Sequence, residues 1–497
     1  MLLDALLQVA GEEPGAPAVS DPTVTLTYKK LARLASIFRG IIARETQCER
    51  VGIMLPATAA FPAVLMGTWW ARKIAIPLNF LLRAEELLKV LEDAQIDYII
   101  TVKPFAELAG ALPCRVRYLE DLPLRRKMVF AMLWGFPPAP KVEPNQTAVI
   151  LYTSGTTALP KGVELTFGNL HSNCVDCIHS ILNTDARQRF LNILPPFHVF
   201  GLTANVLLPI FMRASVFAIP RFNPIAAVRA FEEHDITVIL AIPSMYAAML
   251  RVKSAKPDAF ANIYIALSGG EPLPDSVRAG FQERFGVILR QGYGLTETSP
   301  VISACRNDED QPGIVGRPIR NAQVRIVDEH MKNLPQGSDG EILVRGPGLM
   351  KGYFHKPEET AKVIDKEGWF HTGDIGRFDD KGFLAITGRI KEMLIIGGEN
   401  VFPREIEAVL EQHEAVLQSA VIGIPDGLRG EVPIAFVIPK KDATVQEDEL
   451  RNFARQRLAS FKTPKKVVVR EDLPTGPTGK ILKRKLREFY ETLEPGR

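Results

Sequence analysis

Residues 148–162 read Ala-Val-Ile-Leu-Tyr-Thr-Ser-Gly-Thr-Thr-Ala-Leu-Pro-Lys-Gly. The four apolar residues 148–151 predict a buried strand. Gly155 lets backbone N–H groups turn toward an anion, and Lys161 adds a positive charge. Pro160 before the lysine and Gly162 after it exclude a Walker A loop, which needs Gly before the Lys and a hydroxyl after it. The stretch therefore predicts a strand followed by a loop that holds polyphosphate, with hydroxyl groups supplied by Thr153, Ser154, Thr156 and Thr157.

The composition is that of a soluble globular protein with more than one domain. The chain has 497 residues, 46% hydrophobic and 24% charged, with a formal net charge of +3. This length exceeds a single core, and the small net charge does not favour a nucleic-acid partner. An odd number of cysteines fits free thiols in a reducing compartment, and the acidic N-terminal segment does not resemble a secretory signal. Since no run of 18 apolar residues occurs, we expect a cytoplasmic protein without a membrane span.

Strand-like and helix-like segments alternate through the first part of the chain, which indicates an α/β fold with a largely parallel sheet. Residues 25–39 carry apolar side chains at helical spacing. From about residue 324, short strands and turn residues predict a small antiparallel β region. Beyond Thr387, a helix at 404–411, strands at 419–424 and 434–438 and a helix at 447–458 predict a small α/β domain. We therefore expect a large domain of residues 1–388 and a small domain of residues 389–497. The strands expected in the large domain are 51–55, 75–78, 98–101, 148–151, 190–194, 214–219, 238–242 and 264–268.

Five further segments are rich in Gly, Thr and charged residues at places where strands are expected to end. They read Leu194-Pro-Pro-Phe-His-Val-Phe-Gly, Gly292-Tyr-Gly-Leu-Thr-Glu-Thr, Trp369-Phe-His-Thr-Gly-Asp, Gly388-Arg-Ile-Lys-Glu with Gly397-Gly-Glu-Asn-Val, and Pro474-Thr-Gly-Pro-Thr-Gly-Lys. With the loop at 152–162, in this order and spacing, they resemble the core motifs of the adenylate-forming superfamily. That superfamily includes acyl-CoA synthetases, adenylation domains of peptide synthetases and firefly luciferase. The resemblance spans almost the whole chain and implies two steps: a carboxylate attacks the α-phosphorus of ATP and releases pyrophosphate, and a thiol then takes the acyl group from the acyl-adenylate.

The resemblance assigns most of these motifs to the binding of ATP and Mg²⁺. Tyr293 is suited to stack on adenine, Thr296 to bond the α-phosphate and Glu297 to hold Mg²⁺ through oxygen. Asp374 is expected to accept both ribose hydroxyls, and Arg389 to assist at the ribose or the phosphates. The β- and γ-phosphates are assigned to Thr153, Ser154, Gly155, Thr156, Thr157 and Lys161. Gly292 and Gly294 flank the adenine residue, and Gly269, Gly270, Glu271 and Pro272 belong to the segment expected to pass along the adenine and the acyl pocket.

Other residues are assigned to catalysis and to the movement of the small domain. Lys480 matches the lysine that bridges the α-phosphate and the substrate carboxylate, and Lys391 takes the hinge position. After rotation of the small domain, Gly397, Gly398 and Glu399 are expected to line a tunnel for the thiol. His198 is expected beside the junction of acyl group and adenylate, where a catalytic or gating role competes with that of a satisfied core histidine.

Ala158 is a departure from the superfamily pattern, because most relatives have Gly there. Its methyl group disfavours positive φ, which puts ATP affinity in question. A non-catalytic nucleotide-binding protein is therefore one alternative, and a luciferase-like monooxygenase, which would share every motif, is another.

The acid and the acyl acceptor are predicted from the remaining sequence. Residues 395–407 resemble the form common in fatty-acid and related acyl-CoA ligases, which favours coenzyme A over a separate acyl carrier protein. The expected acyl-pocket segments around Phe200, Ser244 and Gly269 are apolar, which favours a hydrophobic acid of medium or long chain, with an aromatic acid as the alternative. Only one helix is expected after Lys480, so we expect no fused carrier domain. Residues 115–136 place five basic residues around and before an apolar run, which either contacts a lipid surface or packs on the protein's own core.

Overall fold

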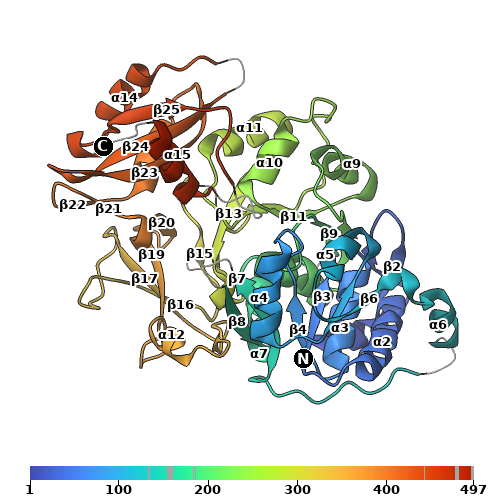
Figure 1. Cartoon of the computed structure of the whole chain (residues 1–497). Coiled ribbons are helices and arrows are strands. Elements are labelled where there is room, and N and C mark those ends of the chain that lie inside the picture. Colours follow the sequence, from blue (N-terminus) through green and yellow to red (C-terminus); the bar gives the residue numbers. More distant parts are fainter. Residues whose placement is uncertain are drawn as a thin grey trace.

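Two sheets of mainly parallel strands form the framework of the large N-terminal part (Figure 1). The computed structural model describes residues 1–131, 135–153, 160–182, 184, 186–309, 311–440, 443–475 and 481–493. In the first sheet β1, β10, β9, β11, β12 and β13 run parallel, and antiparallel strands extend both edges. Its order is β15 (Arg317–Pro318), β14 (Val301–Ala304), β13 (Leu289–Gly294), β12 (Ile265–Ser268), β11 (Val238–Ala241), β9 (Arg189–Asn192), β10 (Ser215–Ala218), β1 (Pro17–Ser20) and β2 (Thr25–Thr27).

The second sheet carries the strand that precedes the predicted phosphate loop. From β7 to β6 its strands are parallel, while β8 and β18 continue it antiparallel beyond β7. The sheet order is β18 (Gly352–Tyr353), β8 (Lys161–Thr166), β7 (Thr147–Thr153), β4 (Ile74–Pro77), β3 (Arg50–Met54), β5 (Tyr98–Thr101) and β6 (Arg115–Tyr118). The strands expected in the large domain are all present, and the predicted α/β class is confirmed.

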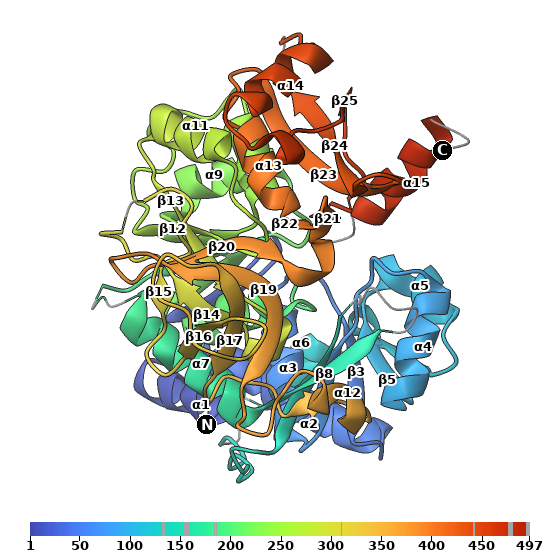
Figure 2. The same cartoon turned by 90° about the vertical axis from the view of Figure 1, so that its left-hand side faces the viewer.

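Two smaller sheets follow in the chain. The first is antiparallel throughout, in the order β16 (Gln323–Val327), β17 (Gly340–Arg345), β19 (Phe370–Phe378) and β20 (Leu384–Arg389). The second contains β22 (Glu399–Val401), β21 (Leu394–Ile396), β24 (Gly430–Pro439) and β23 (Val416–Asp426), with β25 (Lys466–Val469) parallel to β24. Figures 1 and 2 show this last sheet, in orange and red, at one end of the molecule. Sheet membership changes between Arg389 and Leu394, and the domain division at residue 388 stays a prediction.

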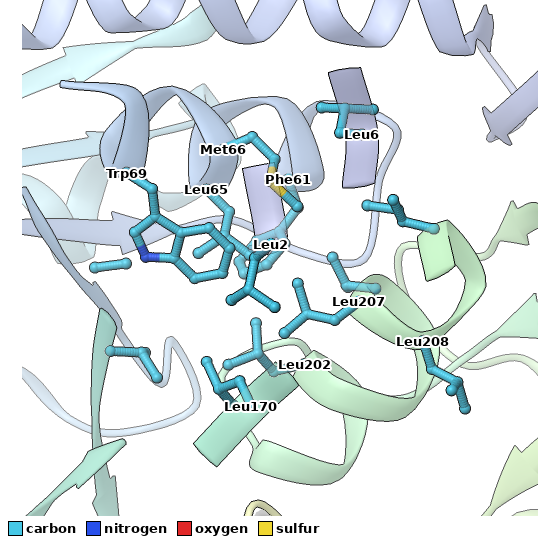
Figure 3. Close-up of a cluster of buried hydrophobic side chains, with 14 of the residues drawn as sticks. Leu2, Leu6, Phe61, Leu65, Met66, Trp69, Leu170, Leu202, Leu207 and Leu208 are labelled. Carbon is cyan, nitrogen blue, oxygen red and sulfur yellow. The ribbon is translucent and has the colours of Figure 1, made fainter. Parts of the chain in front are cut away.

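Helices from both halves of the large part meet in one core (Figure 3). Leu2, Phe61 and Trp69 from α1 and α3 face Leu170 of α7 and Leu202 of the π-helix η3. The indole N–H of Trp69 donates to Ala148 O at 2.8 Å, so the core also fixes strand β7. Each fully buried side chain of this size contributes roughly 1.5–3 kcal/mol to the free energy of folding.

The helices of the large part are α1 (Leu2–Glu12), α2 (Tyr28–Glu45), α3 (Ala60–Trp70), α4 (Ala84–Ala94), α5 (Ala106–Gly110), α6 (Leu124–Ala131), α7 (Phe167–Ser180), η3 (Phe200–Leu207), α8 (Leu208–Phe211), α9 (Pro224–His234), α10 (Pro243–Leu250), α11 (Asp275–Phe285) and α12 (Pro357–Ala361). The small part contains α13 (Pro403–Leu410), α14 (Glu447–Arg455) and α15 (Lys483–Leu493). Short 3₁₀ turns are η1 (Lys103–Phe105), η2 (Leu119–Asp121), η4 (Thr296–Thr298), η5 (Ile390–Glu392) and η6 (Ser460–Lys462).

Two predicted helices differ at their ends. The helix expected at 25–39 begins only at Tyr28, because Thr25–Thr27 pair with β1 and Thr27 Oγ1 caps the helix by accepting the Lys30 N–H. The helix expected to run to residue 458 ends at Arg455. Across the part of the chain that the structure describes, every helix is too short or too polar to traverse a lipid bilayer.

Candidate active site

The described residues of the predicted phosphate loop lie at the end of β7 and the start of β8. Thr153 ends β7 and Lys161 begins β8, and the two residues are register partners. The Thr153 hydroxyl lies 3.5 Å from Lys161 O. Ser154, Gly155, Thr156, Thr157 and Ala158 lie outside the described residues. The pairing of β7 with β8 therefore holds Thr153 and Lys161 side by side.

The ammonium group of Lys161 has two neighbours from a segment almost two hundred residues further along the chain. Its Nζ lies 2.7 Å from Glu359 Oε2 and 4.9 Å from the centroid of the Tyr353 ring. Lys362 also pairs with Glu359, at 2.5 Å. Hydrogen bonds from Lys161 and Lys362 lower the pKa of Glu359 to about 2, so this carboxylate is charged at neutral pH. The lysine is thus fixed in place by one carboxylate and one aromatic face.

Glu297, the predicted Mg²⁺ ligand, lies on the other side of Tyr353. The Tyr353 hydroxyl donates to Glu297 Oε1 at 2.9 Å. Burial and the neighbouring Glu297 raise the pKa of Tyr353 well above its ordinary value, so the hydroxyl stays protonated. Thr296 and Glu297 begin the 3₁₀ turn η4 directly after β13. Tyr353 therefore connects the phosphate-loop lysine to the 292–298 motif.

Tyr293, near the start of the 292–298 motif, belongs to a second group of polar side chains. Asp374 on β19 is 4% exposed, and its two oxygens accept from the Tyr293 hydroxyl at 2.7 Å and from Arg389 Nε at 2.6 Å. Burial raises the pKa of Tyr293, and Asp374 raises it further, so Tyr293 remains a donor. Burial alone would lower the pKa of Arg389, but Asp374 more than offsets this. The structure thus brings Tyr293, Asp374 and Arg389 together, and the Tyr293 hydroxyl is directed at the carboxylate.

Two glycines are required by close backbone approach. A Cβ on Gly294 would lie 2.0 Å from Pro300 O, and one on Gly201 would lie 2.3 Å from Pro195 O. Any larger residue would push these chain segments apart, since real Cβ atoms do not approach oxygens so closely. Gly294 therefore fixes the turn that carries Thr296 and Glu297, and Gly201 fixes the turn after His198.

The segments predicted to bind the acyl group lie after β11 and β12 and in the π-helix η3. The Phe200 ring lies against Gly269, whose Cβ, if present, would be 3.3 Å from the ring. Gly270, Glu271 and Pro272 continue from there toward α11, and Gly292 lies next to β12 and β14. His198 packs beside Phe197, with ring centroids 4.7 Å apart. π-Helices occur frequently at functional sites, which fits the place of η3 directly after His198.

Tyr246, which lies in one of the segments expected to line the acyl pocket, faces the core of the protein. Its hydroxyl donates to Leu267 O at 3.0 Å, and its ring packs edge-on against Phe281. It therefore stabilises strands β11 and β12 from the core side.

The small C-terminal part presents four of its predicted residues, Lys391, Gly397, Gly398 and Glu399, on the surface. Lys391 lies in the exposed turn η5, two residues after Arg389. Gly397 and Gly398, both with positive φ, form the two-residue turn between β21 and β22, and Glu399 begins β22. Lys480 lies outside the described residues, although Thr475 and Ile481 on either side of it form a β-bridge.

Two sequence profiles match this chain. The profile of the AMP-binding enzyme matches residues 6–354, and that of the AMP-binding enzyme C-terminal domain matches residues 405–480. The chain belongs to the AMP-binding enzyme family.

Named relatives of this AMP-binding enzyme include CoA ligases. It is 35% identical to the long-chain-fatty-acid–CoA ligase of Bacillus subtilis (strain 168) over 478 residues, which cover 88% of this chain and 85% of that protein. It is 34% identical to the feruloyl-CoA synthase of an Amycolatopsis species over 483 residues, 96% of each chain. The crystal structure of ATP-bound MatB from Rhodopseudomonas palustris superposes with a TM-score of 0.90 at 29% identity, covering 99% of this chain and 100% of that one; the apo form of MatB gives 0.81. The predicted superfamily and the predicted class, an AMP-forming acid–thiol ligase with ATP and coenzyme A as substrates, are confirmed.

The sequence motifs did not identify two residues that contact the predicted site residues Lys161 and Glu297. Tyr353 and Glu359 lie in the stretch Gly352-Tyr-Phe-His-Lys-Pro-Glu-Glu-Thr, between two of the motifs. Pro357 followed by two glutamates indicates only the start of a helix. The pairing of β18 with β8, which brings both residues to Lys161, has no local signal in the sequence.

Proposed function

We propose that this AMP-binding enzyme activates a hydrophobic carboxylic acid, a medium- or long-chain fatty acid, as the acyl-adenylate and then transfers the acyl group to coenzyme A. The observation that carries the proposal is that one short segment, residues 293–297, contacts two separate groups of polar side chains. Tyr293 meets Asp374 and Arg389, while Glu297, four residues later, meets Tyr353 beside Lys161. A buried carboxylate, a carboxylate suited to a metal ion and a lysine follow one another in this way, and this order supports the proposal that they bind ribose, Mg²⁺ and the terminal phosphates.

The donor set fits ATP and Mg²⁺. Glu297 offers carboxylate oxygen, the ligand that Mg²⁺ prefers, and Lys161 offers a fixed positive charge for the terminal phosphates. Asp374 would accept the ribose hydroxyls, and Thr153 and Thr296 would donate to phosphate oxygens. Bound Mg²⁺ would neutralise charge on the phosphates as pyrophosphate departs. The protein's part is to hold these groups in position before the reaction starts.

The small part, residues 389–497, is proposed to serve the two half-reactions in turn. Lys391 would act as hinge, Lys480 would contact the α-phosphate and the substrate carboxylate, and the exposed turn Gly397–Gly398 with Glu399 would line the path of the thiol. The higher TM-score with ATP-bound MatB than with its apo form supports a domain arrangement suited to ATP in this structure.

The choice of a fatty acid is supported by the relative from Bacillus subtilis and by the apolar contact of Phe200 with Gly269. An aromatic acid is the second candidate, because the feruloyl-CoA synthase of Amycolatopsis is nearly as similar to this chain. Coenzyme A is the proposed acceptor, and a free acyl carrier protein is the alternative.

A peripheral membrane contact through residues 115–136 stays a prediction. Val129 of α6 is 63% exposed, whereas Met128 packs on the main core and Arg33 donates to Ala131 O. Trp134 lies outside the described residues. Binding to anionic liposomes that is unchanged in Val129→Glu and Trp134→Glu would exclude this contact.

A panel of carboxylic acids scored for pyrophosphate release, with and without coenzyme A, tests the proposal. Release that depends on fatty acids, followed by thioester formation with coenzyme A, is the expected result. Activity confined to aromatic acids, or thioester formed only on a carrier protein, would replace the proposed acid or acceptor. Consumption of oxygen with light emission would indicate the monooxygenase alternative, and no pyrophosphate with any acid would contradict the catalytic assignment.

A further inference from the structure

Tyr353 lies between the two groups proposed to hold the phosphates and the metal ion, and the roles described above leave it unassigned. Its ring centroid is 4.9 Å from Lys161 Nζ, and its hydroxyl donates to Glu297 Oε1 at 2.9 Å. The residue is 9% exposed. One rigid side chain thus contacts both groups.

The backbone around Tyr353 is attached to both neighbours as well. Strand β18 pairs with β8, and the Phe354 N–H donates to Gly162 O at 2.8 Å. On the other side, the Met350 N–H donates to Glu297 O at 2.7 Å. Segment 350–354 therefore connects the phosphate hairpin of the second sheet to the turn that follows β13 of the first sheet.

Tyr353 is itself held in place. Its backbone N–H donates to Thr360 Oγ1 at 2.9 Å, and Thr360 Oγ1 donates to Lys356 O at 2.9 Å. The negative face of the ring attracts the ammonium group of Lys161. On the other side of the ring, the Tyr353 hydroxyl donates to the carboxylate of Glu297 at 2.9 Å.

We propose that Tyr353 is a positioning residue that sets Lys161 and Glu297 relative to each other before ATP and Mg²⁺ bind. The inference rests on the proposed function. The hydrogen bond from Tyr353 orients the Glu297 carboxylate, which would bind the metal ion. The Tyr353 ring holds the Lys161 ammonium group in place, so this group is already positioned when the phosphates bind. The hydroxyl therefore acts on the metal side and the ring on the phosphate side.

Two substitutions separate these effects in the full-length chain. Tyr353→Phe removes only the hydroxyl, and Tyr353→Leu removes the ring as well. ATP binding is measured by titration calorimetry without any carboxylic acid, once with Mg²⁺ and once with a chelator. For Tyr353→Phe we expect the affinity for ATP to fall about tenfold with Mg²⁺, the lower end of the loss for an outer-shell contact, and to be unchanged without it. For Tyr353→Leu we expect a fall in both conditions.

Tyr28→Phe is a matched control. Tyr28 is buried in the core, and its hydroxyl donates to Ala214 O at 2.7 Å, so the variant loses a buried tyrosine hydrogen bond away from the site. Its Mg²⁺-dependent gain in ATP affinity should equal that of the wild type, even if its unfolding temperature falls. In a Glu297→Gln background, Tyr353→Phe should cause no further loss with Mg²⁺, because its effect acts through Glu297.

An equal loss with and without Mg²⁺ in Tyr353→Phe, or a full additional loss in the Glu297→Gln background, would overturn the inference. If the wild type binds ATP normally and Tyr353→Phe is unchanged, only this inference fails. A wild-type chain that binds no ATP overturns the proposed function and the inference with it.

Discussion

Replacing Asp374 by Asn tests whether its buried carboxylate holds ATP. Asp374 is 4% exposed, and its carboxylate accepts from Tyr293 and Arg389 at 2.7 and 2.6 Å. Asn has nearly the same shape, but its NH₂ group cannot accept a hydrogen bond. One of the two donors therefore loses its partner, and the carboxylate charge proposed to face the ribose hydroxyls disappears.

The magnitude follows from this geometry. A hydrogen bond to a charged group contributes about 1.5–3 kcal/mol. For ATP the bond at stake runs from a ribose hydroxyl to the carboxylate, and because the Asn oxygen can still accept one hydrogen bond, we take the low end of that range. About 1.5 kcal/mol corresponds to a rise of roughly tenfold in the KM for ATP. The kcat should change little, because the ribose contact is the same in the ground state and the transition state.

The assay is pyrophosphate release at saturating acid, with ATP varied. Asp379→Asn is the control, because Asp379 Oδ1 accepts N–H groups of Lys381 and Phe383 in the β19–β20 turn, and an Asn oxygen can do the same. Its KM should equal that of the wild type. An unchanged KM in Asp374→Asn, or a fall in kcat alone, would refute the reasoning.

Three further predictions concern the small domain and the phosphate lysine. Lys480→Ala should depress adenylate formation while leaving thioester formation from supplied acyl-adenylate largely intact; equal loss in both half-reactions, measured separately, would contradict the proposed division of labour. Lys483→Met should destabilise residues 394–493, because Lys483 Nζ lies 2.9 Å from Glu407 and 2.6 Å from Glu392, and Glu407 is buried. Breaking such an ion pair costs about 3–5 kcal/mol when the pair is fully buried. Hydrogen exchange measures the effect, and Lys483→Arg should retain most of the protection that the Met variant loses. The pKa of Glu359 is lowered from 4.5 to about 2, so its ion pair with Lys161 is complete above about pH 4.5 and is lost only as the pH falls toward 2. The ratio of the ATP KM of Glu359→Gln to that of the wild type should therefore be constant from pH 6 to 8. A change in this ratio across that range would show that another group titrates.

The sequence was informative where a signal is local. The apolar run 148–151 predicted β7, because a buried strand imposes apolar residue types over a few positions. That Lys161 begins a second strand, β8, was not predicted. The helix from residue 25 was placed three residues too early, since helical spacing does not show where a Thr prefers to pair as a strand and cap the helix.

The candidate site was predicted in its parts. Asp374, Arg389, Tyr293 and Glu297 were each identified from motif residues, but the direction of the Tyr293 hydroxyl toward Asp374 was not. A phenol can present its ring face or its hydroxyl, and only the position of β19 beside β13 decides which group it meets.

The sequence by itself determined the family and the order of the motifs, because these depend on residue types within short segments. Only the tertiary structure decided that Tyr353 lies between Lys161 and Glu297 and that Glu359 pairs with Lys161. These contacts join segments far apart in the chain, and they exist because β18 adds to the edge of β8 in one register. Backbone groups, which nearly every residue carries, form the pairing at a sheet edge, so the pattern of side chains does not predict it.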